Sequence, residues 1–343
     1  MVKIFLPTYV KDFKCDGKAC GSRCCRDWRI LLDRETRENY LRLPAADREE
    51  IFSHVDESAQ AFKMQTSGAC PFLDENFLCK LQLKHGEDFL TAICQSFPRV
   101  TYKLGEEIFS QAMTLTCPVA AILILLRDEP INFEFVTELK ARQVFDFTEK
   151  ISLPAEKFLL RQQDAIKILQ RRDLSLNQRL KNLCEFFGEK ISVPIDFDEE
   201  NHAAALAEIF GEMYDANLTI NKKNQLVETY LMHRKNILNQ FRKNFSTILE
   251  NYLVNEFFMR CYPDAFAGDE AFNCRIFVTA YRAVEFAAVL TTISKMRFTV
   301  EDFLEMMCAL NDKMDHSRGG MKAIKNFAEL HDAEVFYSMM IED

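Results

Sequence analysis

Glycine is scarce in this chain, which has 10 glycines and one tryptophan among 343 residues. A Rossmann-type dinucleotide-binding domain needs a Gly-rich turn between a strand and a helix, and no such turn is present. Segments that favour strands do not alternate with helices either. These absences exclude a doubly wound α/β scaffold.

Long apolar runs are also missing. The most apolar segment, residues 276–296, contains Arg282, Glu285 and Lys295, and each charge costs about 2.5–3.5 kcal/mol near the centre of a bilayer. The first residues lack the apolar run and small-residue cleavage site of a secretory signal. We therefore expect a cytoplasmic protein with no membrane partner.

An excess of basic residues is the third absence. The formal net charge is -9 and the isoelectric point is near 5.4, whereas proteins that bind nucleic acid through their overall charge are basic. We therefore expect no nucleic-acid partner.

Cysteine, by contrast, is abundant and unevenly placed. Eight of the 12 cysteines lie in the first 117 residues, and the segment 15–25, CDGKACGSRCC, holds four of them. In a reducing compartment this pattern favours a metal or cluster site over disulfides. We expect four of the following to be ligands: Cys15, Cys20, Cys24, Cys25, Cys70, Cys79, Cys94 and Cys117. The remaining cysteines, Cys184, Cys261, Cys274 and Cys308, fit buried core thiols.

The identity of the metal depends on the donor set. His54 and His85 are the only histidines in the first third, and neither stands at ligand spacing from a cysteine. Sulfur donors alone leave two options, Zn²⁺ held by four cysteines or a [4Fe-4S] cluster. The irregular spacings and the surplus of thiols favour the cluster. Side chains of the adjacent pair Cys24 and Cys25 diverge, so one of them binds a given metal while the other packs, binds a second site or stabilises the first.

The expected fold is mainly α. We predict a cysteine-rich metal- or cluster-binding region over residues 1–125, with short hairpins at 66–80 and 102–110, and an all-helical region over 126–343. Apolar residues recur at helical spacing around Leu180, Phe257 and Phe303, and Thr299 with Asp302 predicts a capped helix start. Pro44 is expected to interrupt a helix over 33–52.

Several segments resemble the flagellin lysine-N-methylase family. They are TYVKDFKC at 8–15, the C-x3-CC motif at 20–25 with WRI at 28–30, CPFL at 70–73, SFPR at 96–99 and ENYLVNEFF at 250–258. The cysteine portion is shared with a broader group of zinc- or iron-chelating domains, so the first and last of these segments carry the specificity.

The resemblance implies methyl transfer from S-adenosylmethionine to lysine ε-amines of flagellin, by an enzyme with a cysteine-held [4Fe-4S] cluster. It implies a methyltransferase that is not of the Rossmann type. Within the helical half, Tyr252 and Glu256 are candidates for catalysis, and Asn255 and Arg282 for cofactor binding. The simpler interpretation of Tyr252 is core packing, and that of Arg282 is an internal ion pair with Glu285.

Two other functions fit the residues. One is a metal-chelating module that binds zinc or iron and has no methyltransferase activity. The other is a chaperone-like protein that binds flagellin and uses zinc only to stabilise its N-terminal region.

Overall fold

The computed structural model describes residues 2–26, 28–138, 141–189, 199–214, 219–316 and 320–330. The chain forms two compact units, each described separately below. The N-terminal unit comprises Met1–Ala120 and Phe133–Asp146, and the helical unit comprises Ala121–Asn132 and Phe147–Asp343. Pro194, which the sequence places in a connection, lies outside the described residues.

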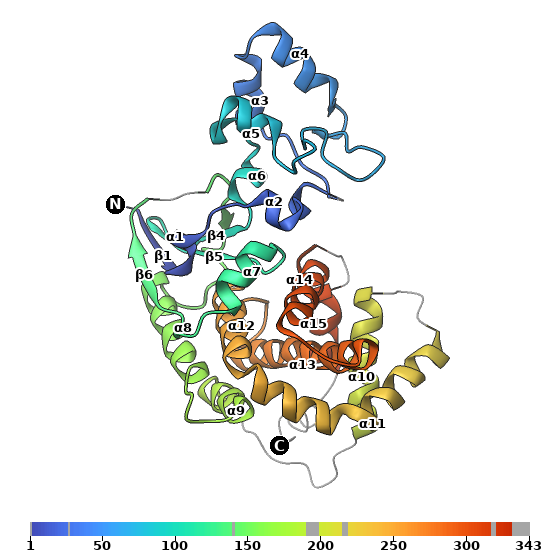
Figure 1. The fold of residues 1–343 in the computed structure, drawn as a ribbon. Coiled ribbons are helices and arrows are strands. Elements are labelled where there is room, and N and C mark those ends of the chain that lie inside the picture. The colour runs from blue at the N-terminus through green and yellow to red at the C-terminus, as the bar shows by residue number, and fades with distance from the viewer. Residues whose placement is uncertain are drawn as a thin grey trace. The chain divides into compact units, whose positions relative to one another are not determined.

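A mixed five-stranded sheet lies in the N-terminal unit (Figure 1). Its strands follow the order β6 (Phe133–Val136), β1 (Lys3–Pro7), β5 (Ile108–Met113), β4 (Arg99–Lys103), β7 (Phe145–Asp146). β1 pairs in parallel with β5 and β4 with β7, whereas the other pairs are antiparallel. The predicted hairpin at 102–110 is present as β4 and β5, with Tyr102 opposite Ser110. The all-helical prediction was wrong for 133–146, because β6 and β7 pair with strands that are distant in sequence.

Short helices and loops make up the rest of this unit. They are α1 (Tyr9–Asp12), α2 (Gly17–Cys20), η1 (Arg23–Cys25), α3 (Arg34–Leu41), α4 (Ala45–Ser53), α5 (Lys80–His85), η2 (Glu87–Phe89) and α6 (Ala92–Ser96), with a small sheet of β2 (Val55–Asp56) and β3 (Ala61–Phe62). As predicted, Pro44 separates two helices, α3 and α4. α7 (Pro118–Leu125) continues from this unit into the helical one.

The hairpin predicted at 66–80 is not formed by strands. A single bridge joins Leu73 to Cys79, and the turn between them is held by the Asp74 carboxylate, which accepts from the backbone N–H groups of Asn76 and Leu78 at 2.9 and 2.8 Å. The side-chain acceptor satisfies the backbone inside the turn, so no ladder forms. The hairpin expected at 66–80, which contains Cys70 and Cys79, is therefore replaced by turns and the start of α5.

The helical unit confirms the mainly α prediction. Its helices are α8 (Ala155–Leu169), α9 (Leu176–Phe186), α10 (Glu199–Tyr214), α11 (Ile220–Asn244), α12 (Ser246–Met259), α13 (Glu270–Lys295), α14 (Val300–His316) and α15 (Gly320–Leu330). α13 packs against α9, α10, α11, α14 and α15 (Figure 1). Among the described helices, α13 alone is long and apolar enough to cross a membrane, and 78% of its apolar window is buried within the protein. That burial is typical of a core helix in a soluble protein.

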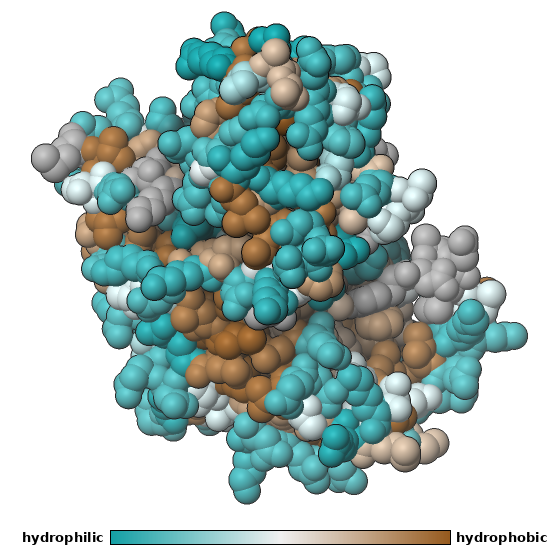
Figure 2. All heavy atoms as spheres, turned by 45° about the horizontal axis from the view of Figure 1, so that its top comes forward, coloured by the Kyte–Doolittle hydropathy of each residue, from teal (hydrophilic) through white to brown (hydrophobic). Residues whose placement is uncertain are grey.

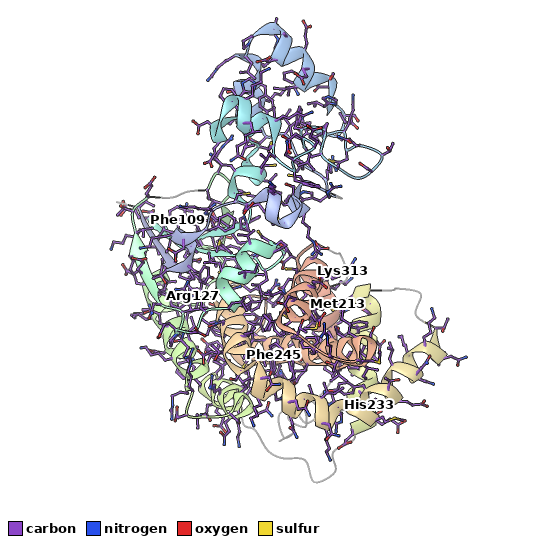
Figure 3. The ribbon with its side chains drawn as sticks, in the orientation of Figure 1. Phe109, Arg127, Met213, His233, Phe245 and Lys313 are labelled. Atoms are coloured by element: carbon purple, nitrogen blue, oxygen red, sulfur yellow. The ribbon has the colours of Figure 1, made fainter. Side chains whose placement is uncertain are left out.

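Phenylalanine side chains join α11, α12 and α14. The rings of Phe245 and Phe303 stack with centroids 5.4 Å apart, and Phe298 meets Phe245 edge-on at 5.4 Å. Figure 3 labels Phe245 where α12 begins and His233 on the exposed side of α11. The predicted cap of α14 is present, with Thr299 Oγ1 accepting from the backbone N–H of Asp302 at 3.2 Å. On the face drawn in Figure 2, hydrophilic side chains cover most of the surface and hydrophobic areas lie between them.

Candidate metal centre

A cavity of about 890 Å³ lies in the N-terminal unit. Its wall includes all eight cysteines predicted as ligands, which come from segments spread over a hundred residues: Cys15, Cys20, Cys24, Cys25, Cys70, Cys79, Cys94 and Cys117. Arg99 and Arg142 line it as well, with the rings of Trp28, Phe72 and Phe97. The fold thus gathers these thiols at one place, which their spacing in sequence did not require.

The adjacent cysteines are held by a tight turn. Ser22 adopts the left-handed conformation with a φ of 52°, and η1 begins directly after it. The backbone N–H of Cys25 donates to Ser22 O at 2.8 Å, and the N–H of Cys70 donates to Cys25 O at 2.8 Å. The second bond fixes the loop that carries Cys70 against the turn that carries Cys24 and Cys25.

Gly17 brings two further loops together. The backbone N–H of Ser22 donates to Gly17 O at 2.8 Å, and Ser22 Oγ donates to Phe77 O. A Cβ atom at Gly17 would lie 2.7 Å from Phe77 O and 2.8 Å from Ser22 Oγ. Only glycine allows the loop 15–20 to approach the turn 74–78 this closely.

Three of the cysteines lie where a helix begins. Cys79 precedes α5, Cys117 precedes α7, and Cys94 is in the first turn of α6. The Cys79 sulfur accepts from the backbone N–H groups of Leu81 and Gln82, and Cys117 accepts from two N–H groups of α7 in the same way. Hydrogen bonds to sulfur stabilise thiolates and tune iron–sulfur clusters.

The protonation of the thiols follows from burial. Burial raises the pKa of Cys70 and Cys94 to about 12 and that of Cys117 to about 11. The pKa of Cys25 is lowered, first because the Cys24 S–H donates to its sulfur. A metal needs deprotonated thiolates, so its binding here would release protons.

The donor set fits a thiophilic group. Soft thiolates select zinc or iron–sulfur clusters rather than magnesium or calcium. Within the described ranges, no three His, Cys, Asp or Glu side chains are placed to hold a single metal ion. The cavity has about thirty times the volume of a water molecule, which is enough for a multinuclear cluster.

Two arginines near the thiols were not predicted as site residues. Arg99 belongs to the SFPR segment already quoted, and its guanidinium lies 5.1 Å from the centre of the Phe13 ring. Arg142 donates to Leu90 O at 2.8 Å and to the Asp33 carboxylate at 2.9 Å. No local signal marks Arg142, because it reaches the cavity only through the pairing of the segment 133–146 with the sheet.

The helical candidates are buried. Tyr252 and Asn255 in α12 are each 1% exposed. Glu256 is 3% exposed and accepts from Arg260 Nε at 2.6 Å, while the same guanidinium contacts Asp315 at 2.6 Å. Burial raises the pKa of Glu256, although Arg260 acts against that rise. The structure therefore places these residues in the core of the helical unit.

The internal ion pair expected for Arg282 is present. Arg282 is 2% exposed, and it donates to Glu285 Oε2 at 2.5 Å and to Asn177 Oδ1 at 2.9 Å. Arg242 donates to the other oxygen of Glu285 at 2.7 Å. The sequence predicted Cys184 and Cys274 to be separate core thiols, but their Sγ atoms lie 2.7 Å apart.

Comparison with known proteins identifies the family. The model of the FliB lysine N-methylase C-terminal domain matches residues 196–341. Flagellar biosynthetic protein FliU of Salmonella muenchen is 33% identical over 127 residues, which are 75% of FliU and 35% of this chain. The chain belongs to the FliB lysine N-methylase family. The resemblance predicted from the quoted segments is thereby confirmed.

Two lysine-N-methylases are similar over the same length. Those of Salmonella choleraesuis and Salmonella typhimurium are 33% identical over 127 residues, which are 31% of each enzyme and 35% of this chain. No solved structure matches this member of the FliB family. The segment ENYLVNEFF and the four helical candidates lie within the matched range 196–341, whereas the eight cysteines of the cavity precede it.

Proposed function

We propose that this protein is a cytoplasmic lysine N-methyltransferase that uses S-adenosylmethionine to methylate ε-amines of flagellin, and that it carries a cysteine-bound [4Fe-4S] cluster. Membership of the FliB lysine N-methylase family carries the proposal. The relatives, a flagellar biosynthetic protein and two lysine-N-methylases, support the reaction and the flagellar substrate.

The reaction sets clear demands on the protein. The lone pair of a neutral lysine nitrogen attacks the methyl carbon of the sulfonium, the new N–C bond forms, and the C–S bond breaks with its electron pair passing to sulfur. A free lysine has a pKa of about 10.4 and is protonated at neutral pH. The enzyme must therefore remove that proton or disfavour it by burial.

Within the helical unit, Glu256 is the candidate base. Burial raises its pKa, so its carboxylate is a better proton acceptor than an exposed one. Tyr252 lies one turn before it on α12. Because Arg260 occupies the carboxylate, a lysine substrate would have to displace part of that ion pair.

Asn255 and Arg282 are the candidates for the cofactor. A cofactor carboxylate would compete with Glu285 for the Arg282 guanidinium, since both Arg282 and Arg242 already bind Glu285. Asn255, the other candidate, is buried in α12.

The thiols of the N-terminal cavity would hold the cluster. A bound iron–sulfur cluster supplies iron whose reduction potential depends on net charge, hydrogen bonds to sulfur and solvent exposure. Arg99 and Arg142 contribute positive charge at the cavity wall. Trp28 packs edge-on against Phe97 at the cavity wall, with ring centroids 5.6 Å apart.

An anaerobic assay tests the proposal. The full chain is loaded with iron and sulfide, then incubated with purified flagellin and S-adenosylmethionine labelled in its methyl group. We expect label on flagellin lysines, located by mass spectrometry of peptides. Cys94→Ala should lose this activity, whereas Cys308→Ala, a matched change outside the cavity, should retain it. Absence of label with fully loaded protein would contradict the proposal.

A metal-chelating module is the second candidate function, because all eight thiols line one cavity. It predicts tight iron or zinc binding and no heat of binding for S-adenosylmethionine by calorimetry. A measurable heat for the cofactor would favour the methyltransferase instead.

A further inference from the structure

The eight thiols of the cavity divide into two sets of four. In the first set, Cys70 is a buried member of the hydrophobic core around Tyr40 and Phe72, and Cys25, Cys79 and Cys94 pack against that core. We call these four the core set. The loop set comprises Cys15, Cys20, Cys24 and Cys117, which line the same cavity outside this core.

The electrostatic neighbours of the thiols follow the same division. Burial is the main cause of the raised pKa of Cys94, and the other three thiols of the core set raise it further. Burial is also the main cause of the raised pKa of Cys117, and Cys20 and Cys15 of the loop set raise this pKa further. For Cys24 the hydrogen bond to Cys25 and burial come first, followed by the charge of Cys25 and then by those of Cys15 and Cys117, so this thiol neighbours both sets. The charge of Cys25 also raises the pKa of Cys15, so the two sets are neighbours.

The vicinal pair is the point at which the sets meet. Cys24 and Cys25 are consecutive in η1, and each belongs to a different set. Cys25 O accepts from the backbone N–H of Cys70, its partner in the core set, at 2.8 Å. Cys24 O instead accepts from Trp28 Nε1. The Cys24 S–H donates to the Cys25 sulfur, so the two thiols are in contact where the two sets meet.

We propose that the cavity holds two iron–sulfur clusters, one ligated by the core set and the other by the loop set, with Cys24 and Cys25 each supplying one thiolate. Four cysteine thiolates are the usual ligands of one cluster, so eight match two. The inference deepens the proposed function, which requires only one cluster. It makes each of the eight cysteines that line the cavity a ligand of one cluster.

The cavity wall carries charges of both signs. Lys14, Arg99 and Arg142 line it, and so do Asp16 and Glu87, while Arg142 is paired with Asp33 at 2.9 Å. Two clusters with eight thiolates bring negative charge into a partly buried space, and buried charge requires compensation. Burial lowers the pKa of Arg99, and Glu87 and Cys15 act in the opposite direction, so this guanidinium lies near Cys15 of the loop set.

Counting metal in the unmodified chain is the first test. The full chain is reconstituted without oxygen, using ferrous iron and sulfide as the probe, and protein-bound iron and acid-labile sulfide are measured. Two [4Fe-4S] clusters predict about eight irons and eight sulfides per chain. Saturation at about four irons would overturn the proposal, and so would zinc displacing all iron.

Paired variants assign the ligands. Cys24→Ala and Cys25→Ala should each retain about half of the iron. Adding Cys117→Ala to Cys24→Ala changes the same set, so half of the iron should remain. Adding Cys94→Ala to Cys24→Ala changes both sets and should remove nearly all of it. The proposal fails if the same-set pair loses all iron or the cross-set pair keeps half.

Two controls distinguish a loss of iron from a loss of folding or of methyl transfer. Far-UV circular dichroism checks that each variant retains its helices, and the iron count of the unmodified chain stands without any variant. A protein that methylates flagellin with only four irons would refute the second cluster and leave the proposed function intact. Eight irons without methyl transfer would support the second cluster and contradict the proposed function.

Discussion

Glu285 explains how charged residues are accommodated in the apolar helix α13. Its side chain is 1% exposed and accepts from Arg282 at 2.5 Å and from Arg242 at 2.7 Å. Burial by itself raises the pKa of Glu285, but the two guanidinium groups outweigh burial and lower it to about 2. The carboxylate therefore stays ionised and neutralises part of the arginine charge.

Removing that charge should destabilise the helical unit. Glu285→Gln leaves two buried guanidinium groups without their carboxylate, and breaking a buried pair costs about 3–5 kcal/mol. Asp173→Asn removes the exposed partner of Arg171, and we expect a much smaller loss of stability, because solvent screens an exposed ion pair. Urea denaturation followed by circular dichroism measures both. Equal stability of the two variants would mean that the buried network contributes nothing.

The same residue predicts a pH dependence. The pKa of Glu285 is lower in the folded protein than its unfolded value of about 4.3. Its contribution to stability is therefore complete above that unfolded value and is lost as the pH falls towards 2. The difference in stability between the unmodified chain and Glu285→Gln should shrink over this interval. A difference that stays constant with pH would contradict the assignment.

Gly17 provides a prediction for the thiol cavity. Gly17→Ala places a Cβ atom 2.7 Å from Phe77 O, and relieving such an overlap costs on the order of 1–3 kcal/mol. We expect weaker iron retention, because the loop 15–20 must move away from the turn 74–78. Lys18→Ala, an exposed change in the same helix, serves as control. Iron content after dialysis against a chelator compares the two.

Caps determine where several helices begin. Ser175 forms a capping box with Gln178 at the start of α9, since the Ser175 side chain accepts from the N3 backbone N–H while Gln178 accepts from the backbone N–H of Ser175. Ser175→Ala should cost about 1 kcal/mol. Ser246, the exposed first residue of α12, offers a control whose change to alanine should be nearly neutral. Chemical denaturation gives both values, and a neutral Ser175→Ala would exclude the cap as a source of stability.

The sequence predicted features that depend on neighbouring residues, but it did not predict the pairing of strands that are far apart in the chain. Pro44 between α3 and α4, and Thr299 with Asp302 before α14, act on neighbouring residues, so the sequence indicated them directly. β1 pairs with β5 across a hundred residues and with β6 across more. Such pairing leaves no periodic trace in either segment, so the sequence predicted the hairpin of β4 and β5 but not the addition of β1, β6 and β7 to it.

At the scale of the whole molecule, the two units differ in what should stabilise them. Trp28 is the only tryptophan and lines the thiol cavity, so its fluorescence reports the N-terminal unit. Far-UV circular dichroism is dominated by the long helices of the other unit. Ligands that bind only the folded state stabilise it, by about 4 kcal/mol at a thousand times the dissociation constant.

Iron loading should therefore shift the two signals differently. We expect the Trp28 transition in denaturant to move to higher concentration when iron and sulfide are bound, while the circular dichroism transition stays nearly unchanged. The apo and loaded proteins are compared anaerobically. A shared shift of both transitions would show that the units unfold together.

The sequence by itself determined the family of this protein and the type of donor atom that a metal site could use. Twelve cysteines, few glycines and the ENYLVNEFF segment indicated a thiol site, excluded a Rossmann domain and identified the family, because donor type and local pattern are properties of the residues themselves. Only the tertiary structure decided which thiols are neighbours. Cys24 and Cys25 are adjacent in the chain and their thiols are hydrogen-bonded, yet only Cys25 packs against the core around Phe72. Cys94 lies near Cys25 although the two are far apart in the sequence. Burial and backbone pairing, which depend on the whole fold, made that division.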